Sequence, residues 1–183
     1  KYNHYLYFFR KDDIMTFKDK VEYYEIVNPI LNSSEFQRRK YYKHHGDISV
    51  YTHCLAVSKV AYVIAKKFNK DYKSAAIAGL LHDFYCEDWQ KKISKEKFFQ
   101  KHGFTHARDA LLNSRIYFPD LLNEKIENSI LRHMFPLNKI PPKYAEGWIV
   151  NIADKYVSLE VFKHPKSLPM LIGIKRKVRE KNE

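Results

Sequence analysis

Glycine, proline and cysteine are scarce in this sequence, and each shortage excludes a class of protein. Five glycines and seven prolines among 183 residues are too few for a turn-rich β architecture. Two cysteines, Cys54 and Cys86, cannot build a disulfide framework, so we expect both to be reduced packing residues. No apolar run approaches the roughly 18 residues of a membrane span, and no signal-peptide pattern opens the chain. The sequence therefore predicts a cytoplasmic protein built mainly from helices.

Acidic residues are also in the minority, which narrows the choice of partner. The chain has 33 Lys and Arg against 21 Asp and Glu, a formal net charge of +12. Such a surplus suits an anionic partner such as a nucleotide, a nucleic acid or a membrane surface, or it is simply a lysine-rich solvated surface. The basic residues are spread along the whole chain rather than gathered in one block, which argues against nucleic acid.

The hydrophobic pattern predicts one all-α domain of about six or seven helices. Residues 1–44 read as an aromatic, helical extension packed on the domain, 45–162 as the core, and 163–183 as a basic helix or tail. Residues 86–104 lack a helical period and read as a lid or crossing loop. The aromatic residues near the N-terminus fit two roles, a homodimer surface or packing on the domain.

Local signals predict where several helices begin and end. Pro29 should end the first helix. Asp47 is the expected N-cap of a helix from Ile48 to Phe68, and Thr105 and Asn123 are the expected caps of two later helices.

Four residues stand at positions where burial is costly unless they have a partner. His53 lies on the apolar stripe of its helix, and His82-Asp83 end the apolar run from Ser74 to Leu81. Asp154 lies in a line with valines on the last long helix. A buried carboxylate needs a cation or several hydrogen-bond donors. The four residues therefore indicate either a metal site or a hydrogen-bonded structural network.

Imidazole and carboxylate groups suit a divalent transition metal such as Fe, Mn, Zn, Co or Ni, and Cys54 and Cys86 are alternative soft ligands. Four protein ligands would leave positions on a six-coordinate ion for water and a phosphate oxygen. His102 and His133 are two further candidates. They would either hold a second ion that Asp83 bridges or donate hydrogen bonds to phosphate.

These residues resemble the pattern of the HD-domain phosphohydrolases, here a small bacterial single-domain branch. The pattern is a histidine on one helix, a His-Asp doublet on the next and an aspartate far downstream. His53, the doublet in Gly79-Leu80-Leu81-His82-Asp83, and Asp154 match it in order. Two further stretches, from His102 to Ala107 and from His133 to Leu137, also match, so the resemblance covers roughly residues 45–162.

The resemblance implies a helical HD domain in which the matched residues bind one or two ions. His53, His82, Asp83 and Asp154 would be the metal ligands. The histidines between them in the sequence would bind a second ion. The family pattern assigns this role to His102 and His133, and His106 is the alternative to His102. Asp83, His102 and His133 are the residues we expect at the reaction centre.

Several branches of the family also place a phosphate-binding lysine shortly after the doublet. This sequence has Phe84 and Tyr85 there, so that contact is in question. Lys155, Arg108 and His106 are the candidate substitutes.

The predicted function is hydrolysis of a phosphate ester by metal-activated water. The substrate class implied by the resemblance is a nucleotide or another small phosphorylated metabolite. Two alternatives remain: a non-catalytic module that binds metal or nucleotide, and a basic helical protein that binds nucleic acid.

Overall fold

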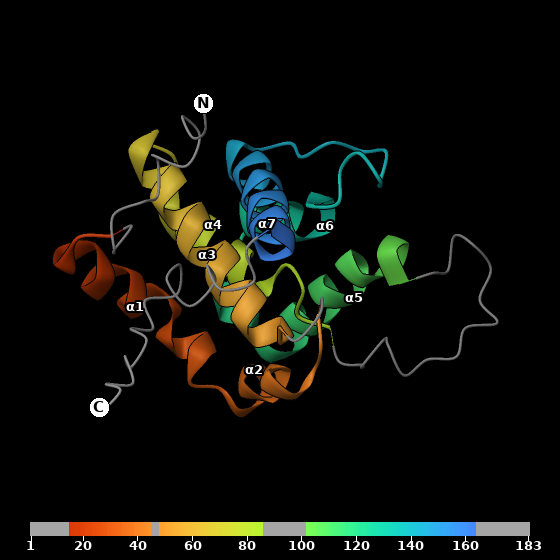
Figure 1. The fold of residues 1–183 in the computed structure, drawn as a ribbon, viewed down its shortest axis with the longest axis horizontal. Coiled ribbons are helices and arrows are strands. Elements are labelled where there is room, and N and C mark those ends of the chain that lie inside the picture. Colours follow the sequence, from red (N-terminus) through yellow and green to blue (C-terminus); the bar gives the residue numbers. More distant parts are fainter. Residues whose placement is uncertain (1–14, 45–47, 86–101, 164–183) are drawn as a thin grey trace, which may run out of the picture.

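The computed structural model describes residues 15–44, 48–85 and 102–163, and its regular elements within those ranges are helices (Figure 1). This confirms the predicted all-α class. The helices are α1 (Phe17–Leu31), α2 (Ser34–Gln37), α3 (Val50–Lys67), α4 (Tyr72–Leu81), α5 (His102–Tyr117), α6 (Glu124–Arg132) and α7 (Ala145–Lys163), with short 3-10 turns η2 (Arg38–Tyr41) and η5 (Pro119–Leu121).

A hairpin of α3 and α4 forms the centre of the fold. The two helices are joined by four residues, among which Asn69 takes a left-handed backbone conformation at φ 51°. They pack closely because Gly79 has no Cβ: a Cβ built there would lie 2.9 Å from the Cα of Ser58. Both helices carry long runs of small and branched apolar residues that are buried. Glycine thus brings α4 against α3 at the end that leads into His82 and Asp83.

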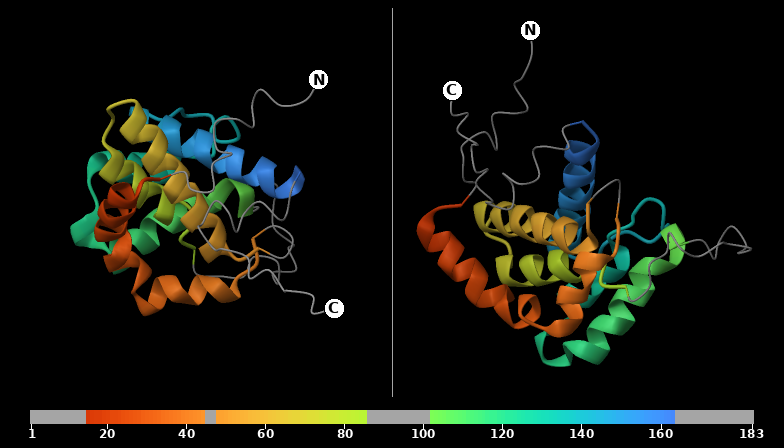
Figure 2. Two further views of the ribbon diagram at one scale, coloured as in Figure 1. Left: turned by 60° about the vertical axis from the view of Figure 1, so that its left-hand side comes forward. Right: turned by 60° about the horizontal axis from the view of Figure 1, so that its bottom comes forward.

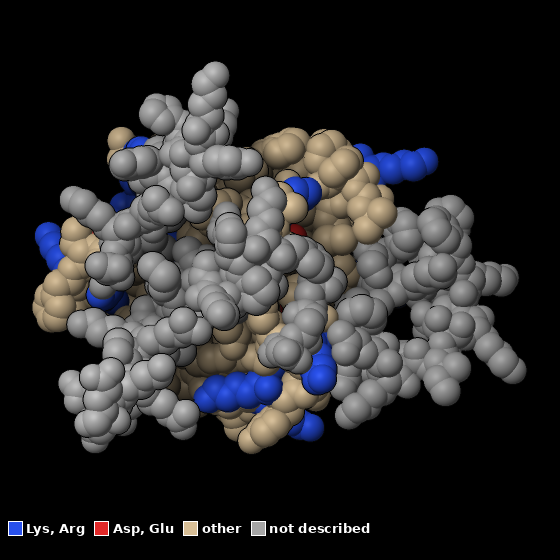
Figure 3. All heavy atoms as spheres, in the orientation of Figure 1, with Lys and Arg blue, Asp and Glu red and all other residues tan. Residues whose placement is uncertain are grey.

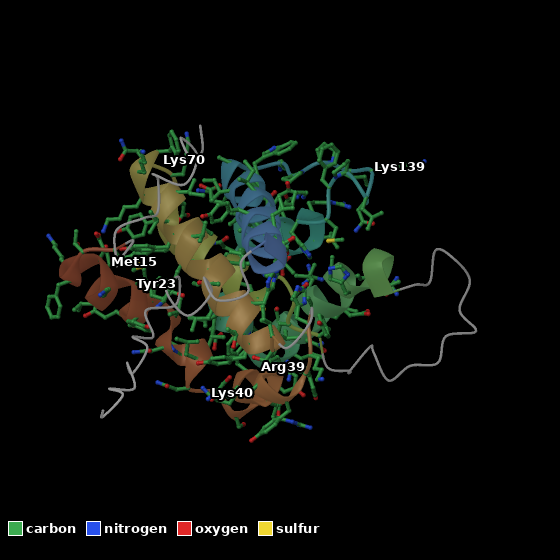
Figure 4. All side chains as sticks on the ribbon, in the orientation of Figure 1. Met15, Tyr23, Arg39, Lys40, Lys70 and Lys139 are labelled. Carbon is green, nitrogen blue, oxygen red and sulfur yellow. The ribbon has the colours of Figure 1, made fainter. Side chains whose placement is uncertain are left out.

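The other helices enclose this hairpin from two sides (Figures 1 and 2). Helix α7 packs on α3, α6 packs on α7 and α4, and α5 packs on α6. Helix α1 lies on the opposite side, where the buried Tyr23 lies between α1 and α3 (Figure 4) and donates a hydrogen bond of 2.9 Å to Ser58 Oγ. The arrangement brings the ends of several helices together beside the first turn of α3.

An ionic network ties α1 to the hairpin. The Glu22 carboxylate accepts hydrogen bonds from Lys66 and from the hydroxyls of Tyr62 and Tyr72, the latter two at 2.7 Å. Asp19 adds a second carboxylate on Lys66, 2.6 Å from its Nζ.

Three predicted helix boundaries are wrong by a few residues. Pro29 lies inside the last turn of α1, where the following Ile30 and Leu31 are buried and hold the helix together. Ser49 caps α3 by accepting a hydrogen bond of 3.2 Å from Thr52 N, so the predicted cap Asp47 is two residues too early. Helix α5 begins before Thr105. The predicted Asn123 cap of α6 is confirmed, since its side chain accepts from Ile126 N at 2.9 Å.

On the face drawn in Figure 3, Lys and Arg side chains lie in several separate places rather than in one patch. Among the described helices, none combines the length and the apolar character needed to cross a membrane. Most of the predicted lid or crossing loop, residues 86–101, lies outside the described residues.

Candidate metal centre

Seven side chains from six parts of the chain meet beside the α3–α4 hairpin. His53 lies in the first turn of α3, and His82 and Asp83 follow α4 directly. His106 comes from α5, His133 follows α6 and Asp154 comes from α7, while His44 precedes α3. All are buried or nearly so: His44, His53, His82, Asp83, His106, His133 and Asp154.

One half of the cluster surrounds Oδ2 of Asp83 and the carboxylate of Asp154. Asp154 Oδ1 lies 3.1 Å from Nε2 of His53 and 3.7 Å from Nε2 of His82. Asp83 Oδ2 lies 4.0 Å from the first of these nitrogens and 3.6 Å from the second. We call these four residues the His53 half.

The other half surrounds Oδ1 of the same aspartate. Asp83 Oδ1 lies 3.4 Å from His106 Nε2 and 3.7 Å from His133 Nε2, and the two nitrogens are 3.1 Å apart. We call Asp83, His106 and His133 the His133 half. The two oxygens of Asp83 thus face different pairs of histidines, so this carboxylate could serve a metal ion in either half.

Backbone carbonyls fix the orientation of two of the imidazoles. His82 Nδ1 donates to Gly79 O at 2.8 Å, and His133 Nδ1 donates to Ile130 O at 2.7 Å. A carbonyl only accepts, so each Nδ1 carries a hydrogen and each Nε2 points into the cluster. Both histidines stand directly after a helix, where the carbonyl three residues back is available.

The donor set fits a divalent metal. Within the described structure, Nε2 of His82 and Oδ1 of Asp83 are buried and have no hydrogen-bond partner, which is costly for polar atoms. Ligand atoms about 2.1 Å from one ion lie about 3.0–3.4 Å from each other. The separations within each half, from 3.1 to 4.0 Å, are close to that spacing.

The electrostatics of the cluster also favour a cation. Burial alone would raise the pKa of Asp83, but the imidazoles around it, foremost His82 and His106, hold it well below its usual range. The pKa of Asp154 is likewise low, because hydrogen bonding to histidine outweighs its burial. Burial alone would lower the pKa of His82, yet the two carboxylates raise it to about 9. Two ionised carboxylates within a buried cluster therefore attract positive charge.

The pKa of His133 shifts in the opposite direction from that of His82. Burial, together with the charges of His82 and His106, lowers the pKa of His133 to about 3. The ring is then neutral at physiological pH, and its Nε2 offers a lone pair to the cluster. Neutral imidazole is the form that binds metals.

The remaining candidates from the sequence are placed differently. His106, predicted as the competitor of His102, reaches Asp83, while the side chain of His102 lies outside the described part of the structure. Arg108 is exposed on α5. Lys155 is exposed next to Asp154 and donates from Nζ to Phe135 O at 2.9 Å.

The sequence analysis did not identify His44 as a site residue, because it falls at the end of the predicted N-terminal extension, residues 1–44. Its Nδ1 lies 3.6 Å from Asp83 Oδ2, and its ring stacks on that of His53. The sequence does show a histidine shortly before the helix that bears His53. A residue outside a helix follows no periodic pattern, however, so the sequence does not indicate which way its side chain points.

The HD domain model matches residues 50–159, more than half of the chain, so the chain belongs to the HD-domain family. The matched segment contains six of the seven clustered residues and excludes His44. No curated protein and no solved structure gives a significant match.

Membership defines the class of protein. HD-domain proteins are generally phosphohydrolases that depend on divalent metal ions, and the histidine and aspartate groups of this chain could hold such an ion.

Proposed function

We propose that this chain hydrolyses a phosphate ester of a nucleotide or another small phosphorylated metabolite, with one or two divalent transition-metal ions in the cluster. The observation that carries the proposal is Asp83, whose two oxygens face two separate groups of imidazoles. A structural network needs only one partner for each carboxylate oxygen. Donors converging from both sides are instead suited to a pair of ions that share a carboxylate.

The chain's own residues hold and orient the reaction centre. In this proposal His53, His82, Asp83 and Asp154 bind one ion, and Asp83, His106 and His133 bind a second. Metal ions in such a site lower the pKa of water and neutralise charge on phosphate oxygens. Nitrogen and oxygen ligands without thiolate suit Fe, Mn, Zn, Co or Ni.

Hydrogen bonds around the cluster keep these ligands in place. Asn151 on α7 donates to the carbonyls of His133 and Phe135. Helix α7, which carries Asp154, therefore also fixes the backbone of His133. Ser158 lies one turn beyond Asp154, with its Oγ 3.5 Å from Oδ1. Such outer contacts raise metal affinity by holding ligands in one geometry.

The substrate class follows from charge and from the family. A net charge of +12 draws anions toward the protein. Phosphate esters match both that charge and the metal chemistry of HD domains, and the nucleotide class rests on the sequence resemblance described above.

The test is a hydrolysis screen of the Mn²⁺-loaded protein against nucleoside mono-, di- and triphosphates, sugar phosphates and a phosphodiester. We expect release of inorganic phosphate or a phosphomonoester from at least one substrate, and loss of that activity in Asp83→Asn. Asp120→Asn is the matched control, because Asp120 is exposed on η5. Binding of both Mn²⁺ and nucleotide without turnover would contradict the enzyme proposal and favour a binding module.

A further inference from the structure

His44 is held beside the metal centre by the backbone that leads into α3. An isolated antiparallel bridge pairs Lys43 with Ser49, and the amide of His44 donates to Ile48 O at 2.8 Å. Since Ser49 is also the cap of the helix that carries His53, the two histidines are fixed relative to each other.

The side chain of His44 lies on the outer side of the His53 half. Its ring stacks on that of His53, with centroids 3.9 Å apart and planes inclined by 25°. Its Nδ1 lies 3.6 Å from Asp83 Oδ2. The side chain of His44 is 13% exposed, against 1% for His53 and 5% for Asp83. Of these three side chains, that of His44 is the one nearest solvent.

A metal ligand is the competing role for His44, because His44, His53 and Asp83 each offer one atom to a possible metal site. His44 is, however, the most exposed of these three side chains and lies outside the matched HD segment, which places it at the edge of the cluster. The contact of 3.6 Å from His44 Nδ1 to Asp83 Oδ2 is too long for a hydrogen bond.

A phosphate in this half needs donors besides a metal, because each of its oxygens carries partial negative charge. The two basic residues suggested by the sequence are poorly placed for that task. Lys155 already donates to Phe135 O, and Arg108 is exposed on α5. Phe84 and Tyr85, which follow the doublet, are buried aromatic residues.

We propose that His44 is a phosphate-binding residue, whose imidazole N–H donates to an oxygen of the substrate phosphate at the His53 half. This inference rests on the proposed phosphohydrolase function and adds a binding residue that lies outside the matched HD segment. The stacked His53 ring and the bridge before α3 hold the donor in place, so little freedom is lost when phosphate binds.

The experiment compares His44→Ala, His44→Asn and Lys43→Ala with the unaltered protein. Asparagine places an amide donor near the position of Nδ1, and Lys43→Ala removes an exposed charge from the adjacent residue. Two quantities are measured for each: Mn²⁺ content and affinity, and the dissociation constant of inorganic phosphate for the Mn²⁺-loaded protein.

We expect His44→Ala to keep Mn²⁺ content and affinity within about twofold while its phosphate dissociation constant rises about tenfold or more, as for loss of one hydrogen bond to a charged group. His44→Asn should recover most of that loss, and Lys43→Ala should stay within about twofold. For any ester that the protein hydrolyses, His44→Ala should raise KM more than it lowers kcat.

Other outcomes overturn the inference in distinguishable ways. A fall in Mn²⁺ affinity in His44→Ala would make His44 a metal ligand. Unchanged phosphate affinity in both His44 variants, with hydrolysis intact in the unaltered protein, would refute the role of His44 alone. An unaltered protein that binds Mn²⁺ but neither binds phosphate nor hydrolyses any ester would refute the proposed function and this inference together.

Discussion

Gly79→Ala should destabilise the protein and disturb the metal centre at the same time. A Cβ at this position would lie 2.9 Å from Ser58 Cα, 3.1 Å from Ser58 N and 3.4 Å from Ala61 Cβ. The nearest two atoms belong to the backbone of α3 and cannot rotate away. The added methyl group must therefore push α4 from α3.

The magnitude follows from two opposing terms. Overpacking in a close-packed core costs about 1–3 kcal/mol, and the close approach to backbone atoms of α3 puts this position in the upper part of that range, at about 2–3 kcal/mol. Alanine favours a helix interior over glycine by about 1 kcal/mol, which offsets part of that cost. The expected net loss in the free energy of unfolding is about 1–2 kcal/mol, which for a chain of this size lowers Tm by roughly 2–8 °C.

The assay is chemical and thermal unfolding of the purified variant, together with its Mn²⁺ affinity. His82 Nδ1 donates to Gly79 O, so moving α4 also moves His82 and should weaken Mn²⁺ binding. Lys73→Ala, at an exposed position of the same helix, is the control and should change stability by less than about 0.5 kcal/mol. A Gly79→Ala protein as stable as the original, or more stable, would refute the close packing on which this reasoning depends.

Two further changes test contacts outside the proposed ligands, one beside the site and one in the ionic network between α1 and the hairpin. Asn151→Ala removes the side chain that donates to both His133 O and Phe135 O. It should lower the free energy of unfolding by about 1–3 kcal/mol and reduce the Mn²⁺ content. Unchanged unfolding and metal content would contradict the role assigned to Asn151. Hydrogen bonding to Lys66 lowers the pKa of Glu22 from 4.5 to about 2, so the stabilisation is present above pH 4.5 and is lost as pH falls toward 2. Glu22→Gln should therefore be less stable at neutral pH and show a flatter decline in stability between pH 4.5 and 2, which urea unfolding at several pH values measures; identical pH profiles would count against the ion pair.

The fold class was predictable because helix signals act locally. The Asn123 cap and the apolar runs of α3 and α4 specify helices without reference to the rest of the chain. The first residue of each helix was less predictable, because neighbouring residues compete for the N-cap position. Ser49 and the predicted Asp47 are both good capping residues, and only the folded backbone selects one.

The candidate site was predictable where residues stood on helices or at their ends. His53, the His82-Asp83 doublet and Asp154 were identifiable because polar residues interrupt apolar faces. Periodicity favours neither His102 nor His106, because residues four apart share a helix face, and of the two side chains only that of His106 lies within the described structure. His44 was not identified because it lies outside the helices, and its contacts with Asp83 and His53 depend on the tertiary structure.

The most direct test of the account is the metal content of the purified protein, measured by elemental analysis beside Asp83→Ala and the control Asp120→Ala. We predict near-stoichiometric Fe, Mn, Zn, Co or Ni in the original and control proteins, rising toward two ions per chain if both halves fill. Asp83→Ala should lose the metal, because it removes the carboxylate that both halves share. Absence of metal from all three proteins, even after reconstitution with Mn²⁺ or Fe²⁺, would contradict the account and make the cluster a structural network.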